Sequence, residues 1–193
     1  MKYLLKHFLI VFIVAFSLSS CSQATATSNT KEASKTVVAP KADFQFEVGQ
    51  RAGGTAFYSM NAYTGAVSYM VDFGDQAGQW FNYGNIIQEK GNRLTMEAVE
   101  TPEGVIFYAM NTGTGQLYYM TDHGEDPGVW YKFGGMIRQN GLNMLQFNLS
   151  DSPAGRTFYA YDSFTHQTYF LNIYGDNAGK WAKYGTPYTG QEK

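Results

Sequence analysis

Aromatic and other apolar side chains recur along most of the chain in short runs, and polar, glycine-rich stretches separate these runs. Tyrosine and phenylalanine dominate the runs, and both residues favour β-strands, where their rings pack on a pleated surface. No segment combines the longer apolar spacing of an amphipathic helix with capping residues at its ends. The pattern therefore predicts an all-β protein with short strands.

The pattern occurs three times along the chain, with a period of 50 and then 51 residues. Each copy carries a Phe-Tyr pair, an acidic loop between two glycines, and one tryptophan. Such self-similarity indicates a repeat architecture, in which each copy forms one structural unit. The middle copy predicts four strands, at Arg93–Glu100, Val105–Met110, Gln116–Thr121 and Val129–Phe133.

The turns between the predicted strands have a recognisable chemistry. Asparagine starts and glycine ends the first hairpin loop in two copies, at Asn61–Gly65 and Asn111–Gly115. An asparagine side chain can cap a turn, and glycine can adopt the left-handed conformation that closes it. The third copy has Asp162 and His166 at these places. Because a positive φ costs more at histidine, this hairpin is expected to use another turn.

Three repeats of four strands suggest an all-β, trefoil-like closed body, with a propeller-like or open β-meander arrangement as the alternative. The resemblance to the β-trefoil family lies in the number of strands and repeats, because that family often has Gln-x-Trp where this chain has Gly-x-Trp. The acidic loop is similar to the Asp-box turn of sialidase propellers, with a different spacing. The motif F-Y-x-x-N-x-x-T-G resembles a hairpin of quinone-type propellers. Propellers usually have four or more blades.

The first 21 residues have the features of an export signal. Lys2 and Lys6 precede an apolar run, Phe8–Leu18, that is short for a membrane span and ends in small residues. The junction Leu18-Ser19-Ser20-Cys21 resembles the lipobox of bacterial lipoproteins. The resemblance implies cleavage before Cys21 and acylation of its thiol, with palmitate as a typical acyl chain. The alternative is an ordinary signal peptide with a chance cysteine.

These features predict three segments: a signal peptide at 1–20, a lipid-anchored flexible tether at 21–42, and the repeat domain at 43–193. The tether is rich in Ser, Thr, Ala and Lys, so it buries too little apolar area to offset its ordering entropy. The protein is expected in the cell envelope. Ser22 follows the cysteine without a retention signal, which favours the outer membrane.

Charge and cysteine content narrow the expected partners. The net charge is −2, and loss of the two signal-peptide lysines makes the mature chain more acidic. Nucleic acid is therefore an unlikely partner class, because its binding requires a basic patch. Cys21 is the only cysteine, so its acylation leaves no thiol for a disulfide, a metal or catalysis. No cofactor is expected.

The candidate ligand contacts are aromatic. Trp80, Trp130 and Trp181 occupy equivalent places, where they either fill the shared core or expose platforms on which sugars stack. Tyr63 and Phe164 lie in hairpin turns, where burial is less expected and contact with a partner more so.

Residues that could perform catalysis or hold a metal do not form a known motif. Acidic residues gather in one kind of loop, which fits solvated turns better than a Ca²⁺ site. His123 and His166 lie at different places in their repeats, and zinc needs three or four ligands. The sequence thus predicts a non-enzymatic module that binds a protein or a glycan. A carboxylate-based enzyme acting on envelope polysaccharide and a purely structural role are the alternatives.

Overall fold

The computed structural model describes residues 43–87 and 93–187, which belong to one compact unit of the chain. The predicted signal peptide, the predicted acylation site Cys21 and the predicted tether lie outside the described residues. The last residues of the predicted domain, 188–193, also lie outside them. In the part of the chain that the structure describes, no helix is long and apolar enough to span a membrane.

Twelve strands and no helix make up the described residues, which confirms the all-β prediction. The first repeat forms β1 (Phe44–Arg51), β2 (Gly54–Asn61), β3 (Val67–Val71) and β4 (Phe81–Tyr83). The second forms β5 (Leu94–Thr101), β6 (Gly104–Asn111), β7 (Leu117–Thr121) and β8 (Tyr131–Phe133). The third forms β9 (Leu145–Ser152), β10 (Gly155–Asp162), β11 (Gln167–Asn172) and β12 (Ala182–Tyr184).

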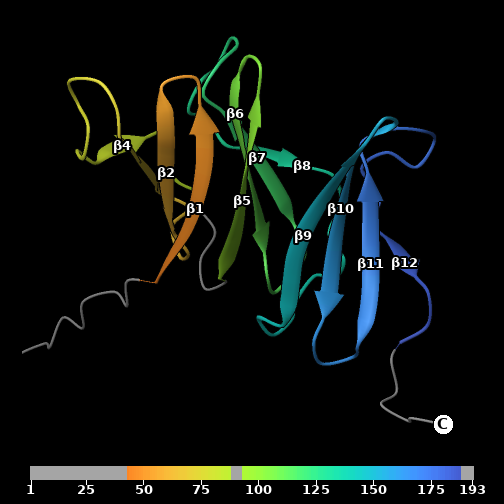
Figure 1. Cartoon of the computed structure of the whole chain (residues 1–193). Coiled ribbons are helices and arrows are strands. Elements are labelled where there is room, and N and C mark those ends of the chain that lie inside the picture. Colours follow the sequence, from red (N-terminus) through yellow and green to blue (C-terminus); the bar gives the residue numbers. More distant parts are fainter. Residues whose placement is uncertain (1–42, 88–92, 188–193) are drawn as a thin grey trace, which may run out of the picture. The chain divides into compact units, whose positions relative to one another are not determined.

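Each repeat forms its own antiparallel sheet, in which neighbours in sequence are neighbours in space (Figure 1). The orders are β1-β2-β3-β4, β5-β6-β7-β8 and β12-β11-β10-β9, named below the first, second and third sheet. The register is also repeated, since Glu47 pairs with Tyr58, Glu97 with Tyr108 and Asn148 with Tyr159. The three predicted four-stranded repeats are therefore confirmed.

The first hairpin loop of each repeat closes through the predicted side-chain caps. The Oδ1 atom of Asn61 accepts hydrogen bonds from the backbone N–H groups of Tyr63 and Thr64, at 2.9 and 3.2 Å. Asn111 and Asp162 accept the equivalent pairs of bonds in the second and third repeats. These bonds satisfy backbone donors that the turn removes from the strand ladder.

The prediction that the third hairpin would use another turn is wrong. His166 has φ 57°, close to the 67° of Gly65 and the 76° of Gly115. Its N–H donates to the Asp162 carbonyl at 2.8 Å, which is the bond that the two glycines make to their asparagines. A hydrogen bond of 2.6 Å joins His166 Nδ1 to the Tyr161 hydroxyl and holds the side chain beside this turn.

The sheets pack face to face in chain order, and β5 lies next to both β1 and β9 (Figure 1). The contact of the first and second sheets is named the first junction, and that of the second and third sheets the second junction. Strand alternation turns Tyr58 and Met60 toward Leu94 and Met96 in one core, while Tyr108 and Met110 form the other core with Leu145 and Phe147. Within the described residues, no strand ladder joins one sheet to another, so closure into a trefoil-like body is not seen.

Candidate functional site

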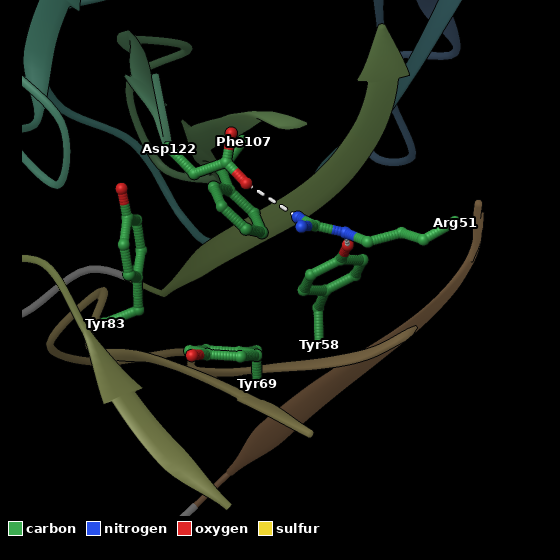
Figure 2. Close-up of a pocket in the computed structure, with 6 residues that line it drawn as sticks. All are labelled: Arg51, Tyr58, Tyr69, Tyr83, Phe107 and Asp122. Atoms are coloured by element: carbon green, nitrogen blue, oxygen red, sulfur yellow. Dashed lines mark hydrogen bonds and ion pairs between the residues drawn. The ribbon is translucent and has the colours of Figure 1, made fainter. Parts of the chain in front are cut away.

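A cavity of about 190 Å³ opens at the first junction (Figure 2). Four aromatic rings form its walls, and an arginine and an aspartate lie together at one side of it. The lining residues are Arg51, Tyr58, Tyr69, Tyr83, Phe107 and Asp122.

Strand alternation explains why these side chains meet. Tyr58 in β2, Tyr69 in β3 and Tyr83 in β4 lie on the face of the first sheet that packs against the second sheet. Phe107 of β6 approaches this face and packs edge to face on Tyr58, with ring centroids 5.2 Å apart. Asp122 directly follows β7. The cavity therefore takes residues from five strands and one turn.

Arg51 connects the two sheets across the cavity. Its Nη2 donates to Asp122 Oδ2 at 2.6 Å, and its Nε donates to the Tyr58 hydroxyl at 3.0 Å. The Tyr58 hydroxyl in turn donates to Glu100 Oε1 at 3.4 Å. Arg51 is 36% exposed and Asp122 18%, so the ion pair remains accessible from solvent. The two charged groups can exchange part of this bonding for bonds to a polar ligand.

Asp122 is held in its ionised form. Burial by itself would raise the pKa of this carboxyl group, but hydrogen bonds from the Val105 N–H, Arg51 and His123 outweigh burial and lower the pKa below its usual value. The bond from Val105 is 2.7 Å long, and His123 Nδ1 lies 3.1 Å from Asp122 Oδ1. Asp122 is therefore a fixed negative charge and an acceptor at neutral pH.

Two tyrosines of the cavity, Tyr58 and Tyr83, stay neutral. Burial raises the pKa of Tyr58, and this effect exceeds the opposing influence of Arg51. Burial also raises the pKa of Tyr83, whose hydroxyl donates to the Thr121 carbonyl at 3.0 Å. Both rings therefore present apolar faces to the cavity while their hydroxyl groups remain bonded to protein atoms.

The second junction keeps the aromatic positions, but its ion pair lies within one sheet: Arg156 pairs with Asp151, and both belong to the third sheet. Thr101 and Ile173 occupy the positions equivalent to Arg51 and Asp122, and these two side chains cannot form an ion pair. Instead Arg156 of β10 donates to the Tyr108 hydroxyl at 2.7 Å and lies 5.0 Å from the centre of its ring. An ion pair that joins the two sheets, as Arg51 and Asp122 do, is therefore the feature that the first junction does not share with the second.

The predicted tryptophan contacts do not meet at one site. Trp130 and Trp181 are half-buried beside the two cores, and each indole N–H donates to a turn carbonyl of the preceding repeat, Gly65 or Gly115, at 3.1 and 3.0 Å. Trp80 belongs to the first repeat and is 48% exposed. The expectation that the three indoles have equivalent surroundings is wrong, because Trp80 has no preceding repeat within the described residues.

The two aromatic residues at turn tips are exposed, Tyr63 by 40% and Phe164 by 72%. Neither lines the cavity at the first junction. The middle repeat has Gly113 at the matching position, so the tips do not form a regular set of three.

The described residues contain no group of three or more His, Cys, Asp or Glu side chains placed to hold a metal ion. The acidic loop is a solvent-exposed turn in each repeat: the N–H of its second glycine donates to the end of the preceding strand, as from Gly78 to Val71 at 2.9 Å. Asp72 and Asp122 serve the hairpin next to them, since they accept hydrogen bonds from the N–H groups of Thr55 and Val105, the second residues of β2 and β6, at 2.7 Å.

Sequence reasoning missed the cavity. Arg51 is not repeated at the matching positions, Thr101 and Ser152, and this departure from the repeat was the available signal. Tyr69 and Tyr83 looked like ordinary strand aromatics. Comparison with known protein families, curated proteins and solved structures found no match to this chain.

Proposed function

We propose that this chain is a lipid-anchored protein of the bacterial cell envelope whose repeat domain binds a glycan non-covalently in the cavity of the first junction. The observation that carries the proposal is the combination of tyrosine and phenylalanine faces with an accessible Arg51–Asp122 pair. A sugar ring has one apolar face, which stacks on aromatic rings, and hydroxyl groups that bond to charged side chains.

The volume of the cavity fits a small group. Drug-sized ligands usually occupy about 300–1,000 Å³, whereas this cavity has about 190 Å³. One sugar unit at the end of a longer glycan therefore suits it better than a whole oligosaccharide. The other parts of such a glycan would extend into solvent past Arg51, which is partly exposed.

The state of Asp122 does not suit this residue to be the proton donor of an enzyme that cleaves polysaccharide. A glycosidase acid must keep its proton near neutral pH, which requires a raised pKa. The pKa of Asp122 is lowered instead, because hydrogen bonds from Val105, Arg51 and His123 outweigh the effect of burial.

A second mode of binding, contact with a protein, is supported by the exposed turn tips. Tyr63 and Phe164 combine large apolar side chains with 40% and 72% exposure. Aromatic residues of this kind are frequent at the centres of protein interfaces. Substitution of both by alanine would weaken a protein contact and leave glycan binding unchanged.

Saturation-transfer NMR with glucose, galactose, mannose and N-acetylglucosamine tests the glycan proposal. At least one sugar should bind the wild-type chain, and Tyr69→Ala should weaken that binding by tenfold or more. Tyr119→Ala removes the equivalent ring at the second junction and serves as the control. Absence of binding by all four sugars, or equal loss in the two variants, would contradict the proposal.

Membrane attachment through Cys21 is supported by Leu18-Ser19-Ser20-Cys21 behind the apolar run Phe8–Leu18. In detergent phase partitioning, the wild-type chain should enter the detergent phase and Cys21→Ser the aqueous phase. Ser28→Ala, further along the predicted tether, is the control and should behave like wild type. Ser22 carries no retention signal, so the anchored chain should fractionate with the outer membrane.

The arrangement of the sheets supports the propeller-like alternative over a trefoil-like closed body. Each repeat has its own sheet, and the first strands of the three repeats, β1, β5 and β9, are neighbours. Blades of a propeller are arranged in this way around a central axis.

A further inference from the structure

The face of the first sheet that points away from the second sheet is apolar and exposed. It is named the leading face; its apolar residues are Phe44, Phe46, Val48, Phe57 and Met70, with Ser59 and Ser68 on the same face. Its three β1 residues are 62%, 56% and 53% exposed. The equivalent residues of the second and third sheets are covered by the preceding sheet: Leu94, Met96 and Ala98, then Leu145, Phe147 and Leu149.

The opposite end of the domain has a matching surface. The trailing face of the third sheet consists of Gln146, Tyr159, Tyr161, Phe170 and Tyr184. Its tyrosines repeat those of the internal junctions: Tyr58 packs on Phe107 and Tyr108 on Phe158, with ring centroids 5.2 and 5.0 Å apart. Tyr159 is the third member of this series, and Phe57 of the leading face is the remaining phenylalanine.

The indole hydrogen bonds join the second and third sheets to a turn of the preceding sheet. Trp130 and Trp181 donate to the turn residues Gly65 and Gly115 of the preceding sheet. Trp80 is the equivalent donor on the first sheet, and the third sheet offers the equivalent turn at His166. That turn has the required shape, because His166 has φ 57° against 67° and 76° at the two glycines.

A contact between glycine backbones is also repeated at the two internal junctions, and its equivalent residues lie at the two ends of the domain. At the first junction Gly84 lies against Gly128, and at the second Gly134 lies against Gly179, so closely that neither Gly84 nor Gly134 leaves space for a side chain. The next residue donates across each contact, from Asn85 N–H to the Gly128 carbonyl at 2.8 Å and from Gly135 N–H to the Gly179 carbonyl at 2.9 Å. The remaining members of the series are Gly185 and Gly78, and the space beside both is open among the described residues.

A glutamine on the trailing face could align the two end surfaces by bonding to a strand backbone, as Gln45 does at the first junction. At the first junction the Gln45 amide donates to the Leu94 carbonyl at 2.7 Å and accepts from the Met96 N–H at 2.6 Å. Gln146 is its equivalent on the trailing face and is exposed. Phe44 and Phe46 of the leading face have the backbone positions of Leu94 and Met96.

We propose that the trailing face of one chain binds the leading face of a second copy, so that two copies form two identical junctions and close a ring of six sheets. The internal junctions are the template, and the apolar faces, the indole, the glycine contact and the glutamine each have an equivalent partner position at the opposite end. A head-to-tail contact gives a ring when its rotation closes, and six blades lie within the usual range for propellers. This proposal does not depend on what the cavity binds.

Light scattering of the full chain in detergent, combined with gel filtration, tests the proposal. Phe46→Lys puts a charge on the leading face, and Tyr184→Lys puts one on the trailing face; both residues are exposed, by 56% and 64%, so a single copy tolerates the change. The control is Leu142→Lys, which alters a 66% exposed residue outside both faces.

Wild type and Leu142→Lys should contain two copies, and each face variant alone should contain one copy. An equimolar mixture of Phe46→Lys and Tyr184→Lys should again contain two copies, joined through the one junction whose two faces are both unaltered, while the other junction carries both lysines and stays open. Single copies of wild type, assemblies larger than two, pairing by either face variant alone, or no pairing in the mixture would each overturn the head-to-tail ring.

Discussion

The Arg51–Asp122 pair distinguishes the first junction from the second, and the charge of Asp122 affects stability as well as binding. The pKa of Asp122 is lowered in the folded chain, where Val105, Arg51 and His123 bond to the ionised carboxylate more strongly than burial opposes it. In the unfolded chain an aspartate has a pKa of about 3.9. The interaction therefore stabilises the fold fully above that value, and the stabilisation is lost as the pH falls through the lowered pKa.

Asp122→Asn should lower the free energy of unfolding by about 1–3 kcal/mol at pH 7, because the bond from Arg51 loses its charged acceptor. The difference from wild type should shrink as the pH falls below about 4, where the wild-type carboxylate takes up its proton. Urea unfolding at a series of pH values measures both effects. Asp72→Asn is the control, since Asp72 makes the same turn bond to Thr55 at 2.7 Å. A difference that does not change with pH would contradict the stated cause.

The tryptophans should separate into two classes. Trp130→Ala and Trp181→Ala should each cost about 3–5 kcal/mol, because they remove half-buried rings that pack against a core and an indole hydrogen bond. Trp80→Ala should cost clearly less, because this ring is 48% exposed. Denaturant unfolding in the Phe46→Lys background, which keeps the chain as single copies, makes the comparison. Equal losses in all three variants would contradict it.

Single-residue features could be predicted from the sequence where the chemistry is local. Asn61, Asn111 and Asp162 cap their own turns, so residue type and position were sufficient. The cavity depends instead on which faces of two sheets meet, and Arg51 reaches Asp122 from 71 residues away in the chain. The repeat alignment made the three tryptophans equivalent, but it could not reveal that, among the described residues, no preceding sheet covers the first repeat.

At the scale of the strand and turn, a side chain added at a glycine can destabilise the fold in two ways, through a positive φ and through a collision. Two glycines allow these effects to be measured separately. Gly115 has φ 76°, and a side chain there would meet Ile137, whereas Gly124 has φ 86° with open space around it. Gly124→Ala should cost about 1–2 kcal/mol, the usual penalty for a left-handed residue with a Cβ. Gly115→Ala should cost more, because it adds the collision. Thermal unfolding of the two variants provides the test, and equal costs would contradict the role of Ile137.

The predicted strands of the middle repeat were right in number and close in their ends, because strand runs and glycine turns alternate clearly there. Val129–Phe133 was predicted as a strand, but only Tyr131–Phe133 pairs with its neighbour. Val129 and Trp130 leave the ladder because the Trp130 N–H donates to Asn85 Oδ1 in the first sheet at 3.1 Å. This long-range bond has no signature in the local sequence. The turn of the third hairpin was also predicted wrongly. His166 has the positive φ that glycine adopts freely, and its side chain bonds to the Tyr161 hydroxyl.

At the scale of the molecule, the three repeats differ in how many faces of their sheets are covered, because the sheets pack one after another in chain order. The second sheet is covered on both faces, while the first and third sheets each have one face that no other sheet covers within the described residues. The sequence could indicate three units of four strands, because the period is plain. The sequence could not indicate whether the three sheets close into a ring. Residues at equivalent positions of the repeat lie in an internal junction in one repeat and on an exposed face in another.

Hydrogen exchange of the full chain should distinguish the covered second sheet from the exposed faces of the first and third sheets. Amides of β6 should exchange most slowly, because β6 lies inside the second sheet and its Phe107 and Tyr108 are buried against opposite neighbours. The Met96 amide, bound to Gln45, should be protected at every protein concentration. The Phe46 amide should exchange rapidly in dilute protein and slowly in concentrated protein, where Gln146 of a second copy covers it. Mass spectrometry of peptic fragments at two concentrations measures the difference. Exchange at Phe46 that is independent of concentration, beside a protected Met96, would contradict the pairing of copies and leave the order within one chain intact.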